Sequence, residues 1–157
     1  MRFVGTVRWS DYDLQGEAER ERALRASGYF MRLMGATRDG RPFEAEAMRE
    51  ESLSSRAWLE AELAEPAAGR WDKTVVITHF APSALSADPR YGAAQPASAS
   101  FCNADDDLLP AADLWLHGHL HCRHDYRVGT TRIVSNARGH ARKGEAAGFD
   151  GLRLIEV

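Results

Sequence analysis

The sequence contains few cysteines, few lysines and no long hydrophobic run. Cys102 and Cys122 are the only two cysteines among 157 residues, which excludes a disulfide framework and predicts a cytoplasmic chain with free thiols. The apolar stretches are far shorter than the roughly 18 residues needed to cross a bilayer. No charged and then apolar leader opens the chain. We therefore expect neither a membrane partner nor export.

An excess of basic charge is also missing. The chain carries 20 basic and 23 acidic side chains, for a net charge of −3, and this balance argues against a nucleic-acid partner. All basic residues except Lys73 and Lys143 are arginines, which indicates a GC-rich bacterial genome. The composition is 44% hydrophobic and 27% charged, as in ordinary globular proteins. The length fits one domain, residues 1–157, by the usual prior of about 100–200 residues.

The pattern of apolar residues predicts an α/β fold. Short runs rich in β-branched and aromatic residues predict strands, and three- or four-residue apolar spacings predict helices. We expect strands at residues 2–9, 73–78, 113–116, 126–128, 131–135 and 151–157, and helices at residues 17–34 and 43–65. A long loop is expected at residues 79–100, and the acidic run at 105–107 is expected to begin a short helix.

The histidines are concentrated at the ends of two predicted strands. Four of the six histidines, His117, His119, His121 and His124, lie within eight positions, and His79 follows the strand at 73–78. If these strands are parallel neighbours, their carboxyl ends meet at one edge of the sheet, where ligands usually collect. Imidazole binds Zn, Mn, Fe and Ni. We therefore expect His79, His119 and His121 to bind divalent metal, with a bend at Gly118 aiming the last two at one region.

Other interpretations apply to single residues of this cluster. A histidine that follows a strand, such as His79, is more often an ordinary hydrogen-bonded residue. His117 precedes the bend, so we expect it beside the metal ligands rather than among them. We expect His124 to be solvated. Cys122 is a candidate soft ligand, but as a strand neighbour of His121 it is expected to face the opposite side.

Several segments are similar to motifs of a known family. These segments are Thr78–Ser83 (THFAPS), Asp113–His121 (DLWLHGHLH), Asp125–Gly129 (DYRVG), Ser135–Gly139 (SNARG) and Phe3–Tyr12. They resemble the C-terminal motifs of calcineurin-like metallophosphoesterases, and the resemblance covers nearly the whole chain. It implies an α/β fold, a four-layer sandwich of two mixed sheets flanked by helices, of which this chain represents about the later half.

The resemblance also implies a reaction and a set of site residues. The family hydrolyses phosphate mono- or diesters with two divalent metal ions, so the implied partner is a small phosphate ester, with Mn, Fe, Zn or Ni as cofactor. His79 and His119 match ligands of the second metal, and His121 matches a ligand of the first. Asn136 and Arg138 match late motif positions and are expected to lie beside the metal ligands or to contact substrate. The sequence identifies no catalytic acid or base.

The chain departs from the family at important positions. The earlier motifs D-x-H, G-D-x-x-D and G-N-H, which carry the remaining ligands, do not occur in this sequence. Phe80 replaces a second histidine, while Ala137 and His140 replace proline and tyrosine. We therefore expect a phosphoesterase domain truncated at its N-terminus, weak or inactive alone. The alternatives are a non-catalytic metal-binding or interaction protein, and a half-enzyme completed by another chain or by homo-oligomerisation through its exposed strand edges.

Overall fold

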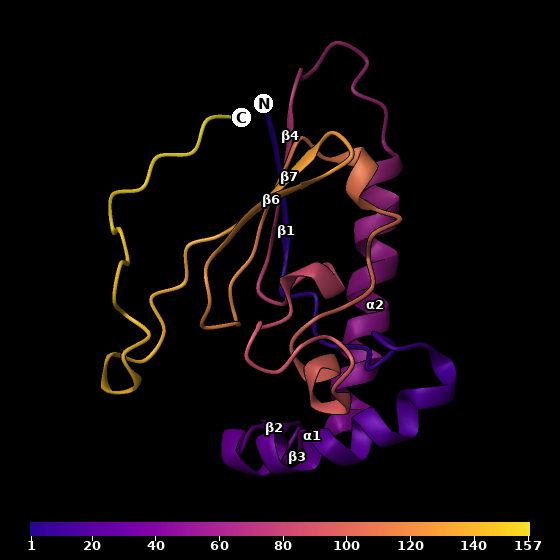
Figure 1. Ribbon diagram of the computed structural model, residues 1–157. Helices are drawn as coiled ribbons and strands as arrows, with labels where there is room; N and C mark the ends of the chain where they lie inside the picture. Colours follow the sequence, from indigo (N-terminus) through magenta and orange to yellow (C-terminus); the bar gives the residue numbers. More distant parts are fainter.

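The computed structural model describes residues 1–157 and contains one five-stranded mixed sheet (Figure 1). Its strands, in spatial order, are β1 (Arg2–Thr6), β4 (Thr74–Thr78), β5 (Leu114–Leu116), β7 (Thr131–Ser135) and β6 (His124–Val128). The first four are parallel neighbours, and β6 runs antiparallel to β7. Strands β2 (Thr37–Arg38) and β3 (Arg41–Pro42) form a separate small hairpin. The predicted α/β class is confirmed.

The structure contains two long helices, of which the second packs against this sheet. Helix α1 (Arg20–Met34) follows a short 3-10 turn at Glu17–Glu19, and helix α2 (Ala45–Ala64) is the longer of the two. Helix α1 ends at Gly35, whose φ of 57° lets its N–H bond to a carbonyl of the last turn. Figure 1 shows α2 running alongside the sheet and α1 lying below the sheet, across the lower end of α2. Neither helix combines the length and apolar character that a membrane span requires.

The packing of α2 on the sheet forms one of the hydrophobic cores. Val4, Val76, Trp115 and Ile133 come from four neighbouring strands and pack with Leu59 of α2. All five side chains are almost completely buried. Because residues two apart on a strand face the same side, this single row fixes which face of the sheet the helix covers.

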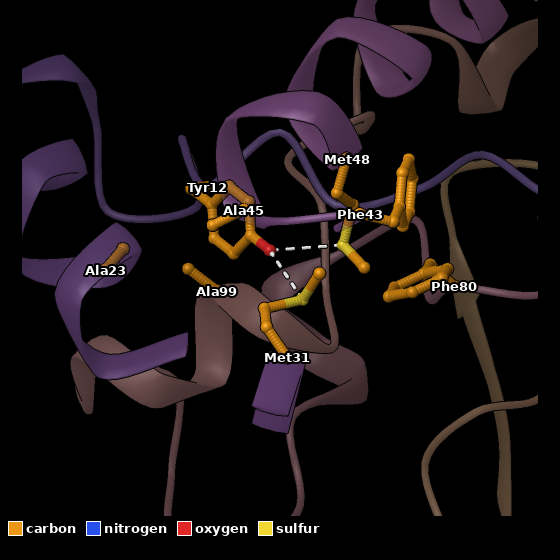
Figure 2. Packing of buried hydrophobic residues seen from close by; sticks show 8 residues of the cluster. All are labelled: Tyr12, Ala23, Met31, Phe43, Ala45, Met48, Phe80 and Ala99. Carbon is orange, nitrogen blue, oxygen red and sulfur yellow. Dashed lines mark hydrogen bonds between the residues drawn. The ribbon is translucent and has the colours of Figure 1, made fainter. Parts of the chain in front are cut away.

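A second core lies between the helices and the loop that follows β4. Figure 2 shows Tyr12 directed between two methionine sulfurs, with its hydroxyl 3.1 Å from Met48 Sδ and 3.9 Å from Met31 Sδ. Phe80, which follows β4, packs in the same cluster and is 2% exposed. The residue immediately after His79 is therefore anchored in the core.

The opposite face of the sheet is covered in part by the C-terminal segment. Ile155 packs on Val75, Leu114 and Val134. The strand predicted at residues 151–157 is wrong, because this segment forms no strand. Its backbone does not pair with a sheet edge. Instead, the side chain of Ile155 lies on the sheet, while Leu152 and Leu154 remain exposed.

Three other predicted elements are shorter or more ordered than expected. Strand β1 ends at Thr6 rather than at residue 9, because Arg8 has a φ of 46° and its side chain turns into the protein. The loop at residues 79–100 contains 3-10 turns at Ala84–Ser86 and Pro96–Ser100. The short helix expected from residue 105 is a 3-10 turn at Leu109–Ala111.

Candidate metal site

The carboxyl ends of β4 and β5 bring two of the predicted histidines to one edge of the sheet. The strands pair in parallel, with Ile77 opposite Leu116, as the sequence suggested. Beyond the paired residues, Gly118 N donates to His79 O at 3.1 Å, and His79 N donates to Val7 O at 3.2 Å. Chain segments on both sides therefore hold the backbone of His79.

His79 and His119 face one another through ring nitrogens. His79 Nε2 lies 3.1 Å from His119 Nδ1. Two donors bound to one ion at about 2.0–2.2 Å, with an angle of roughly 90–110° between them, are about 3.0–3.5 Å apart. The observed separation therefore suits two ligands of a single metal ion. The same spacing also suits an N–H···N hydrogen bond when one ring carries its proton there.

The backbone of His119 makes the bend that the sequence placed at Gly118. His119 has a φ of 61°, whereas Gly118 is not in the left-handed region. That conformation costs a non-glycine residue roughly 1–2 kcal/mol, and such residues concentrate at functional sites. Aromatic packing holds the ring, which stacks on Phe80 with centroids 4.1 Å apart and lies 5.2 Å from Phe101.

Both imidazoles of this pair are neutral near pH 7. Burial lowers the pKa of His79. Burial, with a smaller contribution from His79, lowers the pKa of His119 to about 4. A neutral imidazole keeps a nitrogen lone pair, which is the form that binds metal.

The third predicted ligand, His121, has different neighbours. Its Nδ1 lies 3.1 Å from Glu145 Oε2, and its ring is 4.5 Å from that of His140. The structure thus pairs His79 with His119 and sets His121 against the loop that carries Glu145. No group of three or more His, Cys, Asp or Glu side chains is arranged to hold an ion.

His117, which directly follows β5, is buried and holds the surrounding elements together. Its Nε2 lies 3.0 Å from Ser86 Oγ, which in turn lies 2.7 Å from the Tyr126 hydroxyl. Burial lowers the pKa of His117 to about 4. The chain of three polar groups connects the loop after β4 with β5 and β6.

The remaining predicted residues lie outside the histidine pair. His124, expected to be solvated, is half-buried in β6. Cys122 is not in a strand, and its Sγ lies 3.1 Å from His124 Nε2. Asn136 Nδ2 donates to Asp150 O at 2.7 Å and so holds the C-terminal loop. Arg138 is exposed.

Sequence reasoning missed two groups of residues around this edge. Glu145 and His140 were not considered as neighbours of His121, and their only signal is an acid five residues after a histidine in a glycine-containing loop. Asp105 was expected to stabilise a helix N-terminus, but it is fully buried in an ion pair with Arg8. Arg8 is 97 residues away in the sequence, and a second partner, Arg56, is 49 residues away, so no local pattern reveals the pairing.

No family model matches the chain, and comparisons with curated proteins and with solved structures find no match.

Proposed function

We propose that this chain binds a divalent metal ion through His79 and His119 and acts as a metal-dependent phosphoesterase. The observation that carries the proposal is the 3.1 Å separation of two imidazole nitrogens at the ends of neighbouring parallel strands. The resemblance of the surrounding motifs to calcineurin-like metallophosphoesterases supports it. The finer fold, a part of that family's four-layer sandwich, belongs to the same proposal.

The chemistry divides between the ion and the protein. A bound divalent ion lowers the pKa of a coordinated water and stabilises negative charge on phosphate oxygens. His79 and His119 supply neutral nitrogen ligands, while Phe80 and Phe101 fix the orientation of the His119 ring. Arg138 is exposed on the loop beyond β7 and carries a positive charge suited to a phosphate ester. Imidazole ligands are compatible with Mn, Fe, Zn or Ni.

The test measures metal binding and hydrolysis in parallel. Isothermal titration with Zn²⁺ or Mn²⁺ is compared for the wild type, His79→Ala and His119→Ala, with His124→Ala as the matched histidine control. We expect each of the first two variants to bind at least tenfold more weakly and the control to bind normally. Turnover of nitrophenyl phosphate and bis-nitrophenyl phosphate should follow metal occupancy. Unchanged affinity in both His79→Ala and His119→Ala contradicts the proposal.

Exposed apolar residues favour a second candidate function, that of a non-catalytic protein that binds metal and associates with itself. Leu152 is 89% exposed and Leu154 is 94% exposed on the C-terminal segment, and Phe3 of the edge strand β1 is 65% exposed. Clustered exposed apolar side chains and unpaired strand edges favour association. Metal binding without turnover of either ester, together with a concentration-dependent mass in sedimentation equilibrium, supports this candidate over the first.

A further inference from the structure

We infer that three aromatic side chains beside the candidate metal site, Tyr29, Phe30 and Phe101, bind the ring of an aromatic phosphate ester. The assignment rests on the proposed function and names its substrate class, an aryl phosphate or a nucleotide, whose phosphate lies at His79 and His119. Aromatic rings pair with other aromatic rings in offset or edge-to-face arrangements. A ring in the leaving group is therefore the part of a substrate that this surface recognises.

The three rings continue outwards from the imidazole of His119. Phe101 lies 5.2 Å from His119 between ring centroids. Phe30 lies 5.0 Å from Phe101 and 5.5 Å from Tyr29, and both pairs are edge-to-face, with interplanar angles of 76° and 74°. These separations fall in the range of roughly 4.5–7 Å that is typical of aromatic pairs. A row of neighbouring rings therefore leads from the candidate ligand to helix α1.

The rings of this row keep part of their surface open to solvent. Phe101 is half-buried, whereas Phe30 is 36% exposed and Tyr29 is 59% exposed. Phe80, which stacks on the same imidazole, is by contrast buried in the core. Adjoining exposed apolar side chains beside a polar site are typical of ligand-binding surfaces. The three side chains offer ring surface and no cationic group, so the surface suits a planar ring rather than the phosphate.

Backbone hydrogen bonds hold Phe101 close to the histidine pair. Phe101 O accepts from Ala81 N at 3.2 Å, and Asn103 N donates to Ala81 O at 2.8 Å. Because Ala81 is two residues after His79, the loop that carries Phe101 is fastened to the segment that carries the candidate ligand. This part of the surface is therefore preformed, which limits the entropy lost on binding.

Helix α1 places the outer rings beside this loop. Met31, the neighbour of Phe30, is buried in the cluster of Figure 2 together with Ala99. Ala99 lies in the 3-10 turn that ends just before Phe101. The packing that fixes Met31 against this turn therefore also sets the position of Phe30 next to Phe101.

A protein partner that packs on α1 is the other occupant that exposed apolar rings suit. The contact of Phe101 with His119 favours a ligand of the histidine pair, because a partner bound to α1 alone does not require that continuity. The two occupants differ in a measurable way. Only a ligand of the pair gains affinity from a ring that is joined to a phosphate-like group.

Three phosphonates, whose carbon–phosphorus bond resists hydrolysis, serve as probes. Methylphosphonate carries no ring, phenylphosphonate carries a ring directly on phosphorus, and phosphonomethoxyethyl adenine carries a base on a short linker. Isothermal titration of the protein in the presence of Zn²⁺ measures the affinity for each. We expect at least one ring-bearing probe to bind roughly tenfold more tightly than methylphosphonate, in the range of base stacking on aromatic side chains. A preference for phenylphosphonate indicates an aryl ester, and one for the adenine probe indicates a nucleotide.

Two substitutions remove a ring and keep an apolar side chain, Phe101→Leu and Phe30→Leu. Trp58→Leu is the matched control, since Trp58 is 43% exposed on α2 and lies outside the row of rings. Dividing each affinity by that for methylphosphonate in the same variant cancels any change in metal binding, and far-UV circular dichroism verifies folding. Phe101→Leu should lower the preference about fivefold or more, Phe30→Leu should lower it for the longer adenine probe, and Trp58→Leu should keep it.

The outcomes separate this inference from the proposed function. Equal affinities for the three probes, or no measurable affinity, in a wild type that binds Zn²⁺ overturn the aromatic surface and leave the proposed metal pair standing. A preference that survives in both Phe101→Leu and Phe30→Leu also overturns it. A preference that requires Phe101 in a protein that binds no Zn²⁺ supports the aromatic surface and contradicts the proposed function. A folded protein that binds neither Zn²⁺ nor any probe overturns both.

Discussion

Arg8 and Asp105 form an ion pair that is joined by two hydrogen bonds, and both side chains are completely excluded from solvent. Arg8 Nε donates to Oδ2 at 2.9 Å and Nη2 donates to Oδ1 at 2.7 Å. Arg8 also binds Asp11 at 2.7 Å. The carbonyl of Val7, one residue earlier, accepts the hydrogen bond from His79 N. The pair therefore fixes the segment against which the proposed metal ligand is held.

Removal of Asp105 should destabilise the protein severely. Asp105→Ala leaves the Arg8 guanidinium buried with one carboxylate fewer, and breaking a buried pair in this way costs about 3–5 kcal/mol. Asp107→Ala is the control, because the Asp107 side chain is 62% exposed in its pair with Arg56 and exposed pairs contribute about 0–1 kcal/mol. Urea unfolding followed by circular dichroism measures both. Equal losses in the two variants contradict a structural role for the buried pair.

The left-handed backbone at His119 predicts an unusual order of stability between two variants. His119→Gly and His119→Ala lose the same aromatic contacts, but only glycine adopts a φ of 61° without strain. We expect His119→Gly to be more stable than His119→Ala, with a free energy of unfolding about 1 kcal/mol higher. In β6, His124→Gly should instead be less stable than His124→Ala, because glycine weakens strands. Denaturant titration of the four variants measures their free energies of unfolding. If the glycine variant is the less stable one at both positions, His119 carries no backbone strain.

The parts of the fold set by local pattern were predictable from the sequence. Continuous apolar runs located β4 and β5, and helical spacing located both helices to within a few residues. The histidines then followed, because His79 comes directly after β4 and parallel pairing carries it to the same edge as His119. A buried strand that is followed directly by a histidine can therefore be recognised from the sequence alone.

Long-range and rotational features were not predictable. The segment at residues 151–157 was predicted as a strand, yet its backbone pairs with no sheet edge, and it packs on the sheet through Ile155. The sequence could not show that His119 and His121 have different neighbours. The directions of these two side chains depend on the φ of His119, which the sequence does not reveal. Likewise, Glu145 reaches His121 through a turn at Gly139 that local pattern does not reveal.

The burial of His117 predicts that the protein loses stability in mild acid. Burial, aided slightly by His124, lowers the pKa of His117 to about 4, against about 6.5 in the unfolded chain. Between these values the unfolded chain takes up a proton that the folded chain refuses, so stability falls as the pH decreases from about 6.5 to about 4. At pH 5 this group alone lowers the free energy of unfolding by about 2 kcal/mol.

His117→Asn tests this assignment, because asparagine keeps a polar partner for Ser86 but does not titrate. Urea unfolding measures the free energy of unfolding at pH 7.5 and at pH 5. Its decrease between the two pH values should be about 2 kcal/mol smaller in the variant than in the wild type. A residual drop is expected from His119, whose pKa is also lowered to about 4. An identical drop in the wild type and the variant argues against a buried neutral His117.

Gly139→Ala should destabilise the protein more than a matched glycine substitution that leaves room for the new methyl group. The new Cβ needs to avoid Glu145 Cβ at 2.5 Å, and the φ of +66° adds backbone strain. Gly129→Ala matches this strain, with a φ of +56°, but its Cβ meets nothing within 4 Å. We expect Gly129→Ala to cost about 1 kcal/mol of stability and Gly139→Ala to cost about 2–3 kcal/mol, since it adds overpacking to the same strain.

Urea unfolding of both variants, followed by circular dichroism, measures this difference. Gly129→Ala reports the cost of the left-handed backbone alone, so any further loss in Gly139→Ala comes from the contact of the new methyl group with Glu145 and His121. Equal losses in the two variants would mean that the segment carrying Glu145 moves aside without cost.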